Sequence, residues 1–437
     1  MSALAETMNY FGYNVTGSDR VSSDATDKLI KDNIKVLIGH DLKYVTKADL
    51  VVYTAAIPDD DPELVYAREN NIDTMERADF LGLLTKAFKE TICISGTHGK
   101  TTTTSMIATC FLNANLEPNV QVGADLGKLN GNYAIGKSEY FILEACEYVE
   151  SFLKFFPKLE VILNIDNDHL DYFKNFENIK NAFIKYVKRL PNDGFLVING
   201  DDSNCLDLKQ YTNCTILTYG INNNSDFVAK DIKFDNNGFA EFDVYFKSNF
   251  YTHINLSVCG MHNVLNALAC ISACYFYNIP IETIQSSLKE FTGANRRLEF
   301  KGKYKNVSIF DDYAHHPTEI KASVNALKNK KFNQSWVVFQ PHTYSRTKNL
   351  LDDFADALIN YDNIIITDIY AAREKNTYNI SSQDLADKIQ SLGKKVYYIH
   401  TFEEIASFLK DNVNDGDIVV TQGAGPIYEV GNMLLNL

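Results

Sequence analysis

The sequence predicts an α/β protein of three domains, and three observations support that prediction. A chain of 437 residues is too long to fold around one hydrophobic core. Apolar runs of strand length alternate with helical patterns long enough to serve as crossovers. Many of these runs end in a polar turn, which is where open α/β sheets bind ligands. Changes in the pattern place the expected domains at 1–88, 89–298 and 299–437.

Composition and charge exclude several classes of partner. The hydrophobic fraction of 45% and the charged fraction of 22% are ordinary for a globular protein. With 42 basic against 56 acidic residues the formal net charge is −14, so neither a nucleic acid nor an anionic membrane is expected as the main partner. A local basic site for a nucleotide is compatible with that charge, and we expect small-molecule partners.

The cysteines and the apolar stretches predict the compartment. The 8 cysteines form no Cys-x-x-Cys pair, so we expect buried, reduced thiols rather than a metal site. Two of them, Cys270 and Cys274, lie on an apolar helical pattern. No signal segment is recognised, and the longest apolar stretch, 264–277, is too short to span a bilayer. We expect a cytoplasmic protein without membrane insertion.

The first predicted domain alternates short strands and helices. Its apolar runs cover 13–16, 36–38 and 50–53. Polar residues follow the first and third of these runs, and they include Ser18, Asp19 and Thr54. Because ligands bind beyond the carboxyl ends of strands in such sheets, these three residues are candidate substrate contacts.

The segment 92–103 predicts a phosphate loop. An apolar run ends in Gly-Thr-His-Gly-Lys-Thr at 96–101, and a helical pattern follows at 103–113. Backbone N–H groups at a helix start favour an anion. Lys100 would reach the terminal phosphates of a nucleotide, and the Thr101 hydroxyl would bind Mg²⁺. Ile94 stands where the usual pattern has glycine, so a β–α turn with a surface lysine is the alternative.

Two later runs of the middle domain end in residues suited to metal binding. Glu144 ends the run at 140–143, where a carboxylate suits Mg²⁺, although a solvated residue near a helix start is the alternative. The run at 161–165 leads into a polar cluster that contains His169. Its imidazole could join a second metal site or hold a substrate carboxylate, and an Asp-rich turn is the alternative.

His262, Asn263 and Asn266 stand at the start of an otherwise apolar helical pattern. Buried polar groups at such a place need partners. The three residues could cap the helix, or the two amides could recognise the edge of a nucleotide base.

The third predicted domain repeats the α/β pattern. Its strand-like runs cover 307–310, 336–339, 364–367, 396–399 and 418–421. Arg296 and Arg297 fall at the boundary before it, where an arginine could bind a transferring phosphoryl group on domain closure or form a surface salt bridge.

Two polar loops follow neighbouring runs of this domain. Asp-Asp-Tyr-Ala-His-His-Pro occupies 311–317, and Phe-Gln-Pro-His-Thr-Tyr-Ser-Arg-Thr occupies 339–347. Two acids, a tyrosine and two histidines at one strand end are hard to explain as packing. The two loops therefore predict the mouth of a ligand site.

Taken together, these segments resemble the Mur ligase family over essentially the whole chain. The resemblance rests on the phosphate loop, on Asn-x-x-x-Asp-His at 164–169 and on His-Asn-x-x-Asn at 262–266. The segment 311–317, with Phe-Gln-Pro-His at 339–342, resembles the alanine-adding branch of the family. The resemblance implies a Rossmann-like N-terminal domain, a central P-loop ATPase-like domain and a Rossmann-like C-terminal domain.

The implied activity is ATP-dependent ligation of L-alanine to the lactyl carboxylate of UDP-N-acetylmuramate, through an acyl phosphate, in peptidoglycan precursor synthesis. A ligase that adds a peptide to the same nucleotide sugar, and a nucleotide-binding relative without ligase activity, are the alternatives. Alanine against glycine or serine, and monomer against homodimer, stay open at this point.

The resemblance also implies roles for single residues. The catalytic group would be Lys100, His169, Arg297 and His315. The Mg²⁺ ligands would be Thr101, Glu144 and His169. The ATP contacts would be Gly96, Thr97, His98, Gly99, Lys100, Thr101, Thr102, His262, Asn263, Asn266, Arg297, and Asp311 or Asp312 on the ribose. The substrate contacts would be Ser18, Asp19, Thr54, Tyr313, His315 and Arg346.

One departure concerns the first domain. The family begins with a strand and a Gly-x-Gly-Gly-x-Gly loop that binds the UDP pyrophosphate, and residues 1–6 resemble the helix just after that loop. We therefore expect the first strand and the glycine loop to be missing from this sequence through a truncated or misassigned start. If the short form is real, its affinity for the UDP substrate should drop sharply.

Overall fold

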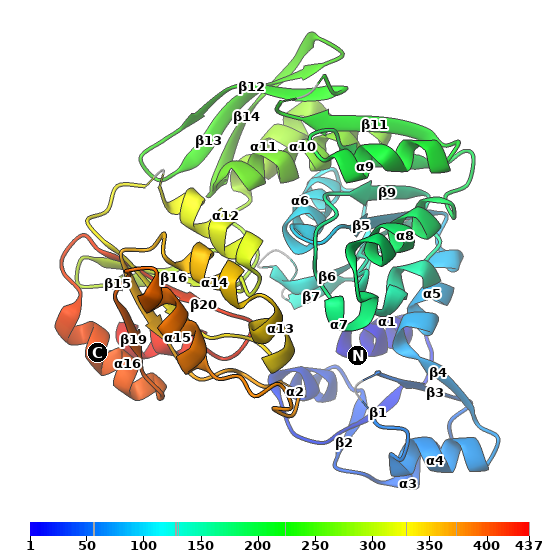
Figure 1. Cartoon of the computed structure of the whole chain (residues 1–437). Helices are drawn as coiled ribbons and strands as arrows, with labels where there is room; N and C mark the ends of the chain where they lie inside the picture. Colours follow the sequence, from blue (N-terminus) through cyan, green and yellow to red (C-terminus); the bar gives the residue numbers. More distant parts are fainter. Residues whose placement is uncertain are drawn as a thin grey trace.

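The computed structural model shows three α/β parts built around separate sheets (Figure 1). The first part carries two short sheets, the second a sheet of ten strands and the third a sheet of six. The structure describes the chain apart from Ala56, Gly127, Lys128, Asn130, Asn223, Asn329, Arg373 and Leu437, and apart from the side chain of Asp171.

The first part holds two separate pairs of parallel strands. The strands are β1 (Thr16–Asp19), β2 (Lys35–Ile38), β3 (Leu50–Tyr53) and β4 (Asp73–Glu76). The helices are α1 (Ser2–Tyr10), α2 (Asp24–Lys31), α3 (Leu42–Val45), α4 (Pro62–Glu69) and α5 (Arg77–Ala87). Within the described residues, β1 pairs with β2 and β3 with β4, and no ladder joins the two pairs.

The strand predicted at 13–16 is wrong in its bounds, because pairing begins only at Thr16. Gly12 adopts a φ of 89°, which closes the turn after α1, and the exposed Tyr13 belongs to the connection that follows. The first part contacts the second through α1, whose Leu4 packs in one core with Leu81 and Phe141.

The ten-stranded sheet of the second part positions the phosphate loop. The strands are β5 (Glu90–Ser95), β6 (Asn119–Leu126), β7 (Gly131–Ala134), β8 (Tyr140–Glu144), β9 (Leu159–Ile162), β10 (Phe195–Asn199), β11 (Thr215–Gly220), β12 (Phe227–Phe234), β13 (Phe239–Phe246) and β14 (Asn249–Cys259). Their order is β14-β13-β12-β11-β10-β9-β5-β8-β6-β7. The central strand β5 runs parallel to both of its neighbours, β8 and β9.

Helices cover both faces of this sheet. They are α6 (Lys100–Asn113), α7 (Leu170–Phe173), α8 (Phe176–Val187), α9 (Ser203–Asp207), α10 (Met261–Phe276) and α11 (Ile281–Glu290), with 3₁₀ turns η2 (Tyr148–Lys154) and η3 (Leu208–Tyr211). Side chains alternate along β5, so that Ile92 and Ile94 pack with α6, α10 and α11, whereas Cys93 packs with α5 and α8. The apolar stretch at 264–277 lies in α10, which is buried on most sides.

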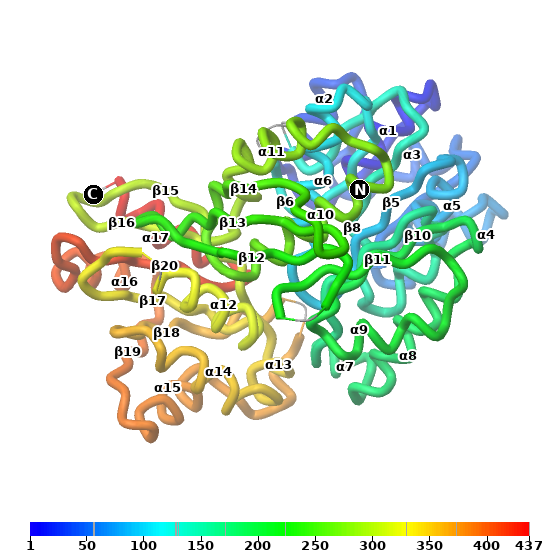
Figure 2. The backbone as a smooth tube through the Cα atoms, turned by 90° about the horizontal axis from the view of Figure 1, so that it is seen from above, coloured from blue at the N-terminus to red at the C-terminus, as the bar shows by residue number. Residues whose placement is uncertain are grey.

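The antiparallel strands at the edges of this sheet were not predicted from the sequence. Strands β12, β13 and β14 form a meander at one edge, and β6 pairs antiparallel with β7 at the other. Buried and exposed residues alternate along β14, as expected for a sheet with one solvated face. The turn after β12 reaches the third part, where Asn237 pairs with Lys330 (Figure 2).

The third part is a six-stranded sheet in the order β15-β16-β20-β17-β18-β19. Its strands are β15 (Glu299–Tyr304), β16 (Val307–Asp312), β17 (Ser335–Phe339), β18 (Asn363–Ile366), β19 (Val396–Tyr398) and β20 (Ile418–Gln422). Its helices are α12 (Pro317–Leu327), α13 (Tyr344–Asn349), α14 (Leu351–Leu358), α15 (Ser382–Ser391), α16 (Phe402–Asn412) and α17 (Tyr428–Leu435). All five strands predicted for this domain are present, and β15 adds an antiparallel edge.

In the part of the chain that the structure describes, no helix combines the length and the apolar character needed to cross a membrane.

Candidate active site

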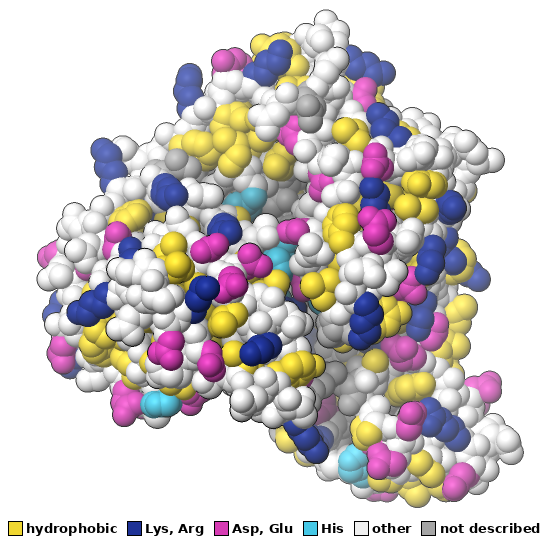
Figure 3. All heavy atoms as spheres, viewed as in Figure 1, with side chains coloured by type: hydrophobic (Ala, Val, Ile, Leu, Met, Phe, Trp, Pro, Cys, Tyr) yellow, Lys and Arg dark blue, Asp and Glu magenta, His cyan; other side chains and the backbone are white. Residues whose placement is uncertain are grey.

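Polar side chains from the second and third parts meet where their strands end. The loops after β5, β8 and β9 approach the loops after β16 and β17, and contacts such as Thr318 to Asp166 join the two parts. Histidine and charged side chains line the hollow between the two parts (Figure 3). The junction therefore gathers most of the residues that the sequence singles out.

The phosphate loop is held in a tight conformation at its two glycines. Gly96 and Gly99 adopt φ values of 128° and 86°, which favour glycine. A Cβ atom at Gly99 would lie 2.8 Å from Oδ1 of Asn266. α6 begins at Lys100, three residues before the predicted helix start, because the left-handed backbone of Gly99 cannot belong to the helix.

Lys100 turns back over its own loop. Its Nζ donates to the carbonyl oxygens of Gly96 and Thr97, at 2.5 and 3.0 Å, and lies 3.0 Å from Oε2 of Glu147. Burial by itself would lower the pKa of Lys100, but Glu147, together with the nearby Cys146 and Glu144, raises that pKa. The lysine is thus kept charged beside the helix start, where an anion would sit.

Asn164 fixes the loop from the neighbouring strand end. Its Oδ1 accepts from the backbone N–H of His98 at 2.8 Å, and its Nδ2 donates to the His98 carbonyl at 3.0 Å. The Thr97 hydroxyl accepts from the backbone N–H of Asp166 at 2.9 Å. Hydrogen bonds of this kind pair the backbone polar groups of a loop that has no neighbouring strand to bond with.

Thr101 and Glu144 lie together, as predicted. The Thr101 hydroxyl donates to Oε2 of Glu144 at 2.9 Å, and the backbone N–H of Gly123 donates to the same oxygen at 2.9 Å. Nη2 of Arg297 lies 3.4 Å from the Thr101 hydroxyl oxygen. A hydroxyl and a carboxylate beside a phosphate loop are the hard oxygen donors that Mg²⁺ prefers, so these residues fit the ion.

His169 lies near Glu147, the acidic residue that also contacts Lys100. Its Nε2 is 4.0 Å from Oε1 of Glu147 and 3.7 Å from Oδ2 of Asp168, and its ring packs 4.6 Å from that of Tyr148. The 3₁₀ turn η2, which carries Tyr148, contains Val149 at a φ of 50°, a strained conformation for a β-branched residue. Such strain is common beside functional groups that must be held in place.

Two of the three polar residues predicted at the start of α10, Asn263 and Asn266, share one local network. Asn266 donates to Oδ1 of Asn263 at 3.0 Å, and Asn263 donates to the carbonyl of Cys259 at 2.8 Å. Burial, followed by the charge of Arg297, lowers the pKa of His262 to about 4, so its imidazole is neutral. Neither contact caps the helix, because a cap accepts from a backbone N–H and these two bonds are donated by side-chain amides. The assignment to adenine stays a prediction.

Arg296 forms a buried ion pair rather than a surface salt bridge. Its Nε lies 2.8 Å from Oδ2 of Asp311, and its Nη2 donates to the carbonyls of Gly423 and Gly425 at 2.8 and 3.0 Å. The Thr421 hydroxyl donates to the other Asp311 oxygen at 2.7 Å. Asp311 therefore anchors the link between the second and third parts.

Asp312 also has protein partners. Ser323 donates to its carboxylate, as does Nε2 of Gln422 at 3.1 Å, and its burial raises the pKa of Asp312 above its usual range. A ribose contact from either acid stays a prediction.

Glu319 is the centre of the contact between the two parts. One of its oxygens lies 3.5 Å from Nδ1 of His98 and 3.9 Å from Nη1 of Arg297, and the other lies 3.5 Å from Nδ1 of His315. Nε2 of His98 lies 3.4 Å from Oδ2 of Asp166. Burial would lower the pKa of His98, but Asp166 and Glu319 raise it to about 9.

The predicted amino-acid contacts form a second group on the third part. Nδ1 of His315 lies 2.9 Å from the carbonyl of Tyr313, and Nη1 of Arg346 lies 3.0 Å from Nδ1 of His342. Arg346 also reaches across to Asp168, whose Oδ1 is 3.4 Å from its Nη2. Burial lowers the pKa of His315 to about 4. Both histidines of this group thus sit beside a fixed cation.

The candidate contacts of the first part lie outside this network. Thr54 follows a strand, as predicted, whereas Ser18 and Asp19 are the last two residues of β1 instead of following a strand. Ser18 donates to Oε2 of Glu63 at 2.5 Å, and the backbone N–H of Val21 donates to Asp19 at 3.3 Å. Thr54 directly follows β3 and is half-buried. Their role in substrate binding stays a prediction.

Sequence reasoning missed four residues that organise the site. Glu147 follows Glu144 by three positions in the same loop, and Asn164 and Asp168 belong to the motif that contains His169. The motifs that contain these three residues were a signal from which the residues could have been identified. Glu319 was not signalled, although it lies four residues after His315 on the first turn of α12, where the pair can meet.

Family models match three segments of the chain. A model described as Mur ligase family, catalytic domain, matches 1–89; the Mur ligase middle domain matches 94–274; and the Mur ligase, glutamate ligase domain, matches 296–425. The matches together cover most of the sequence.

Curated relatives and solved structures agree with these models. UDP-N-acetylmuramate--L-alanine ligase of Clostridium novyi (strain NT) is 51% identical over 435 residues, covering 100% of this chain and 94% of its own length. The protein of the same name from Acetivibrio thermocellus is 49% identical, with coverages of 100% and 93%.

A crystal structure of UDP-N-acetylmuramate-alanine ligase MurC from Thermotoga maritima superposes with a TM-score of 0.84 at 28% identity, covering 100% of this chain and 96% of that one. A murein peptide ligase from Psychrobacter arcticus superposes with a TM-score of 0.73 at 24% identity, which shows a common fold.

Proposed function

This chain belongs to the Mur ligase family, and we propose that it joins L-alanine to the lactyl carboxylate of UDP-N-acetylmuramate at the expense of ATP, in peptidoglycan precursor synthesis. One observation carries the proposal. Relatives that share about half of its residues over its full length bear this activity in their names. The meeting of the phosphate loop, the acidic groups and the 311–317 loop at one junction agrees with that observation.

The three parts divide the work in this proposal. Residues 1–88 bind the UDP group through Ser18, Asp19 and Thr54. Residues 89–298 bind ATP, with the phosphate loop on the phosphates and the α10 amides on adenine. Residues 299–437 hold the amino acid and close over the nucleotide.

Mg²⁺ fits the donor set at the phosphate loop. Thr101 and Glu144 would hold one ion, and His169 beside Glu147 would support a second. When bound, Mg²⁺ neutralises phosphate charge and polarises the γ-phosphate.

Activation of the carboxylate depends on fixed positive charge. The lactyl carboxylate attacks the γ-phosphate, giving an acyl phosphate and ADP, and negative charge spreads over the transferring group. Lys100 is held charged by Glu147, and Arg297 lies within 3.4 Å of the Thr101 hydroxyl oxygen. Cations fixed before the reaction stabilise that charge without reorganisation.

In this proposal His315 accepts the proton of the attacking amine, because its ring is neutral and in the required tautomer and not because it is strongly basic. The Tyr313 carbonyl can only accept a hydrogen bond, so Nδ1 of His315 carries the hydrogen and Nε2 carries the lone pair. The imidazole is neutral because its pKa is lowered to about 4. Tyr313 and Arg346 flank the amino acid in this proposal.

In this proposal the protein works in the cytoplasm, on small-molecule substrates, as a monomer or homodimer. These statements rest on the family and on the absence of any charge pattern for a nucleic acid or membrane partner.

Phosphate release from ATP tests the proposal. The purified protein is assayed with UDP-N-acetylmuramate alone and with L-alanine, glycine, L-serine or a tripeptide. Release that depends on alanine, with the ligated product seen by mass spectrometry, is the expected result. Release with the tripeptide alone would assign the peptide-adding activity instead, and no release with any acceptor would overturn ligase activity.

A further inference from the structure

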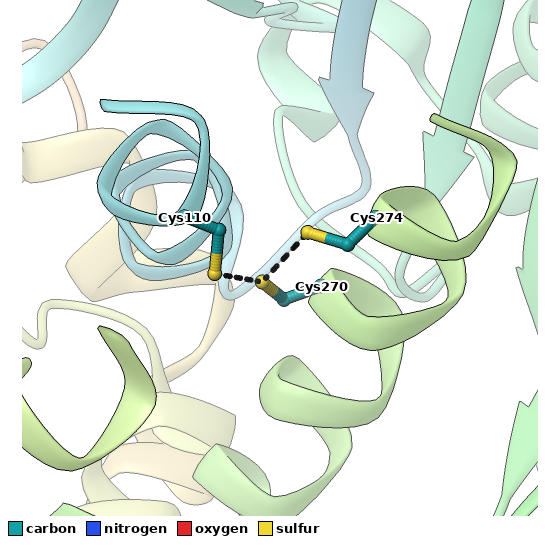
Figure 4. Close-up of side chains that lie close together, drawn as sticks. All are labelled: Cys110, Cys270 and Cys274. Atoms are coloured by element: carbon teal, nitrogen blue, oxygen red, sulfur yellow. Dashed lines mark hydrogen bonds between the residues drawn. The ribbon is translucent and has the colours of Figure 1, made fainter. Parts of the chain in front are cut away.

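Three cysteine side chains meet between α6 and α10. Cys110 on α6 and Cys270 and Cys274 on α10 direct their sulfur atoms toward one another (Figure 4). The Sγ atoms of Cys110 and Cys270 are 3.7 Å apart, and those of Cys270 and Cys274 are 3.9 Å apart. All three sulfurs lie within 4.8 Å of one another, and all three side chains are fully buried. We call this group the thiol triad.

The spacing of the triad suits one shared central atom. Bonds of about 2.3 Å from a central atom to three sulfurs place those sulfurs about 4 Å apart in a planar arrangement and about 3.4 Å apart in the pyramidal arrangement of an atom with a lone pair. Cys270 and Cys274 are four residues apart on one helix, so their side chains project from one face of α10, and Cys110 faces them from the partner helix. Little side-chain movement is needed to bring three bonds to one atom.

The surroundings of the triad decide which atom fits. The three cysteines belong to an apolar core that includes Ile107, Leu268 and Ile271. Zn²⁺ and Cu⁺ bind thiolates, and three thiolates around either cation leave a net negative charge. A net charge in a dry core is strongly unfavourable, and burial raises the pKa of both Cys270 and Cys274. A central atom that combines with neutral thiols to give a neutral complex avoids this penalty.

We propose that the thiol triad is a binding site for a trivalent, thiophilic metalloid, with arsenite as the probe. As(OH)₃ exchanges its three hydroxide groups for the three sulfurs. Three As–O and three S–H bonds break, three As–S bonds form, and three water molecules leave. Arsenic stays trivalent and the sulfurs are not oxidised, so the step needs no further reactant.

Entry requires α6 and α10 to part briefly, because none of the three thiols reaches solvent. Binding is therefore slow, and the product links the two helices. A ligand that binds the folded chain and not the unfolded chain raises the midpoint of thermal unfolding. This effect is independent of ligase activity.

The test uses the purified full chain, incubated with arsenite and then desalted. Intact-mass spectrometry should show a gain of one arsenic atom less three hydrogens. Alkylation under denaturing, non-reducing conditions should then spare the triad and label the other five cysteines, which the chain holds among its 8. X-ray absorption should report three sulfur neighbours around arsenic. Cys110→Ala and Cys270→Ala should lose the adduct, whereas Cys205→Ala, a buried cysteine outside the triad, should keep it.

Several outcomes would overturn the proposal. The first is a chain that carries no adduct even after refolding from urea in the presence of arsenite. The second is an adduct located at the exposed Cys146. The third is an X-ray absorption result with fewer than three sulfur neighbours around arsenic. Retention of Zn²⁺ by the triad without retention of arsenite would overturn the metalloid class. If an alanine variant fails to fold, alkylation mapping of the cysteines in the unsubstituted protein still locates the adduct, so the test still decides.

Discussion

His98 and His315 lie on opposite sides of the same carboxylate, Glu319, yet their pKa values move in opposite directions. The ring of each lies 3.5 Å from one Glu319 oxygen. His98, on the phosphate loop, also faces Asp166, and its pKa rises to about 9. His315, on the third part, has its pKa lowered to about 4, first by burial.

The difference shows how much charge a buried imidazole needs to stay protonated. Glu319 and Asp168 raise the pKa of His315 without offsetting its burial, because Arg346 adds an opposing positive charge. Asp166 and Glu319, both within 3.5 Å of the ring, do offset the burial of His98. In the proposed function, the nucleotide face of the junction, formed by the phosphate loop, thus carries fixed positive charge, and the amino-acid face, formed by the 311–317 loop, carries a neutral base.

Removing the lysine of the nucleotide face should have the largest effect. Lys100→Ala deletes the ammonium group that Glu147 holds in place, so we expect phosphate release to fall by about 10³-fold or more. The far-ultraviolet circular dichroism should not change. Lys388→Ala, which removes a surface lysine paired with Asp352, is the matched control and should leave turnover unchanged. Turnover of Lys100→Ala within tenfold of the original would refute the charge assigned to this face.

Removing the base of the amino-acid face comes next. His315→Gln keeps a hydrogen-bond donor but cannot take up a proton at neutral pH. We expect kcat to fall by about 10²-fold while the KM for ATP stays the same. Steady-state kinetics with varied ATP and alanine measure both, with His253→Gln on the exposed β14 as control. A change in KM alone would show that His315 binds substrate without transferring a proton.

Replacing Glu319, the carboxylate near both histidines, should change the difference between the pKa values of His98 and His315. In Glu319→Gln, His98 keeps Asp166 but loses one carboxylate, so its pKa should fall, as followed by NMR titration. The loss of charged contacts to two histidines and Arg297 should lower the free energy of unfolding by about 2 kcal/mol. We expect kcat/KM to fall by about tenfold. Glu403→Gln, on the exposed face of α16, is the control. An unchanged His98 pKa would mean that Asp166 suffices.

The pH dependence of stability gives the most specific effect, because it reports on single histidines and not on turnover. Because the folded pKa of His98 is above the unfolded value of 6.5, its contribution is complete below pH 6.5 and is lost as pH rises through about 9. Urea unfolding should therefore show stability falling by up to about 1.4 kcal/mol per pH unit in this window from His98 alone. His98→Gln should remove that slope. Equal slopes in both proteins would place the proton elsewhere.

His315 predicts the opposite sign in the same titration. Its folded pKa of about 4 is below the unfolded value, so its contribution is present above pH 6.5 and is lost as pH falls toward 4. His315→Gln should flatten the acid side of the curve and leave the alkaline side unchanged.

Local chemistry made much of this site readable from the sequence. The phosphate loop directly follows β5, Glu144 is the last residue of β8, and the polar cluster with His169 comes soon after β9, so residues near in sequence are also near in space. The five strands of the third part were predicted for the same reason, as compact apolar runs between helical patterns. The meander of β12 to β14 was missed because its one-sided alternation was not separated from the surrounding polar turns.

Contacts between distant segments were beyond that reasoning. Glu319 carries no motif, and its importance comes from His98, which a different sheet brings to it. The same holds for Arg296, expected as a hinge or surface residue and found paired with the buried Asp311. The thiol triad is a third case, since the spacing of Cys270 and Cys274 predicted burial but gave no sign that Cys110 joins them.

The sequence by itself determined the α/β class, the phosphate loop and the resemblance to Mur ligases, because these depend on short patterns that act locally. The tertiary structure decided which histidine is charged. A pKa depends on the number of carboxylates and cations around a group and on its distance from water, and for His98 and His315 those neighbours come from both parts of the junction.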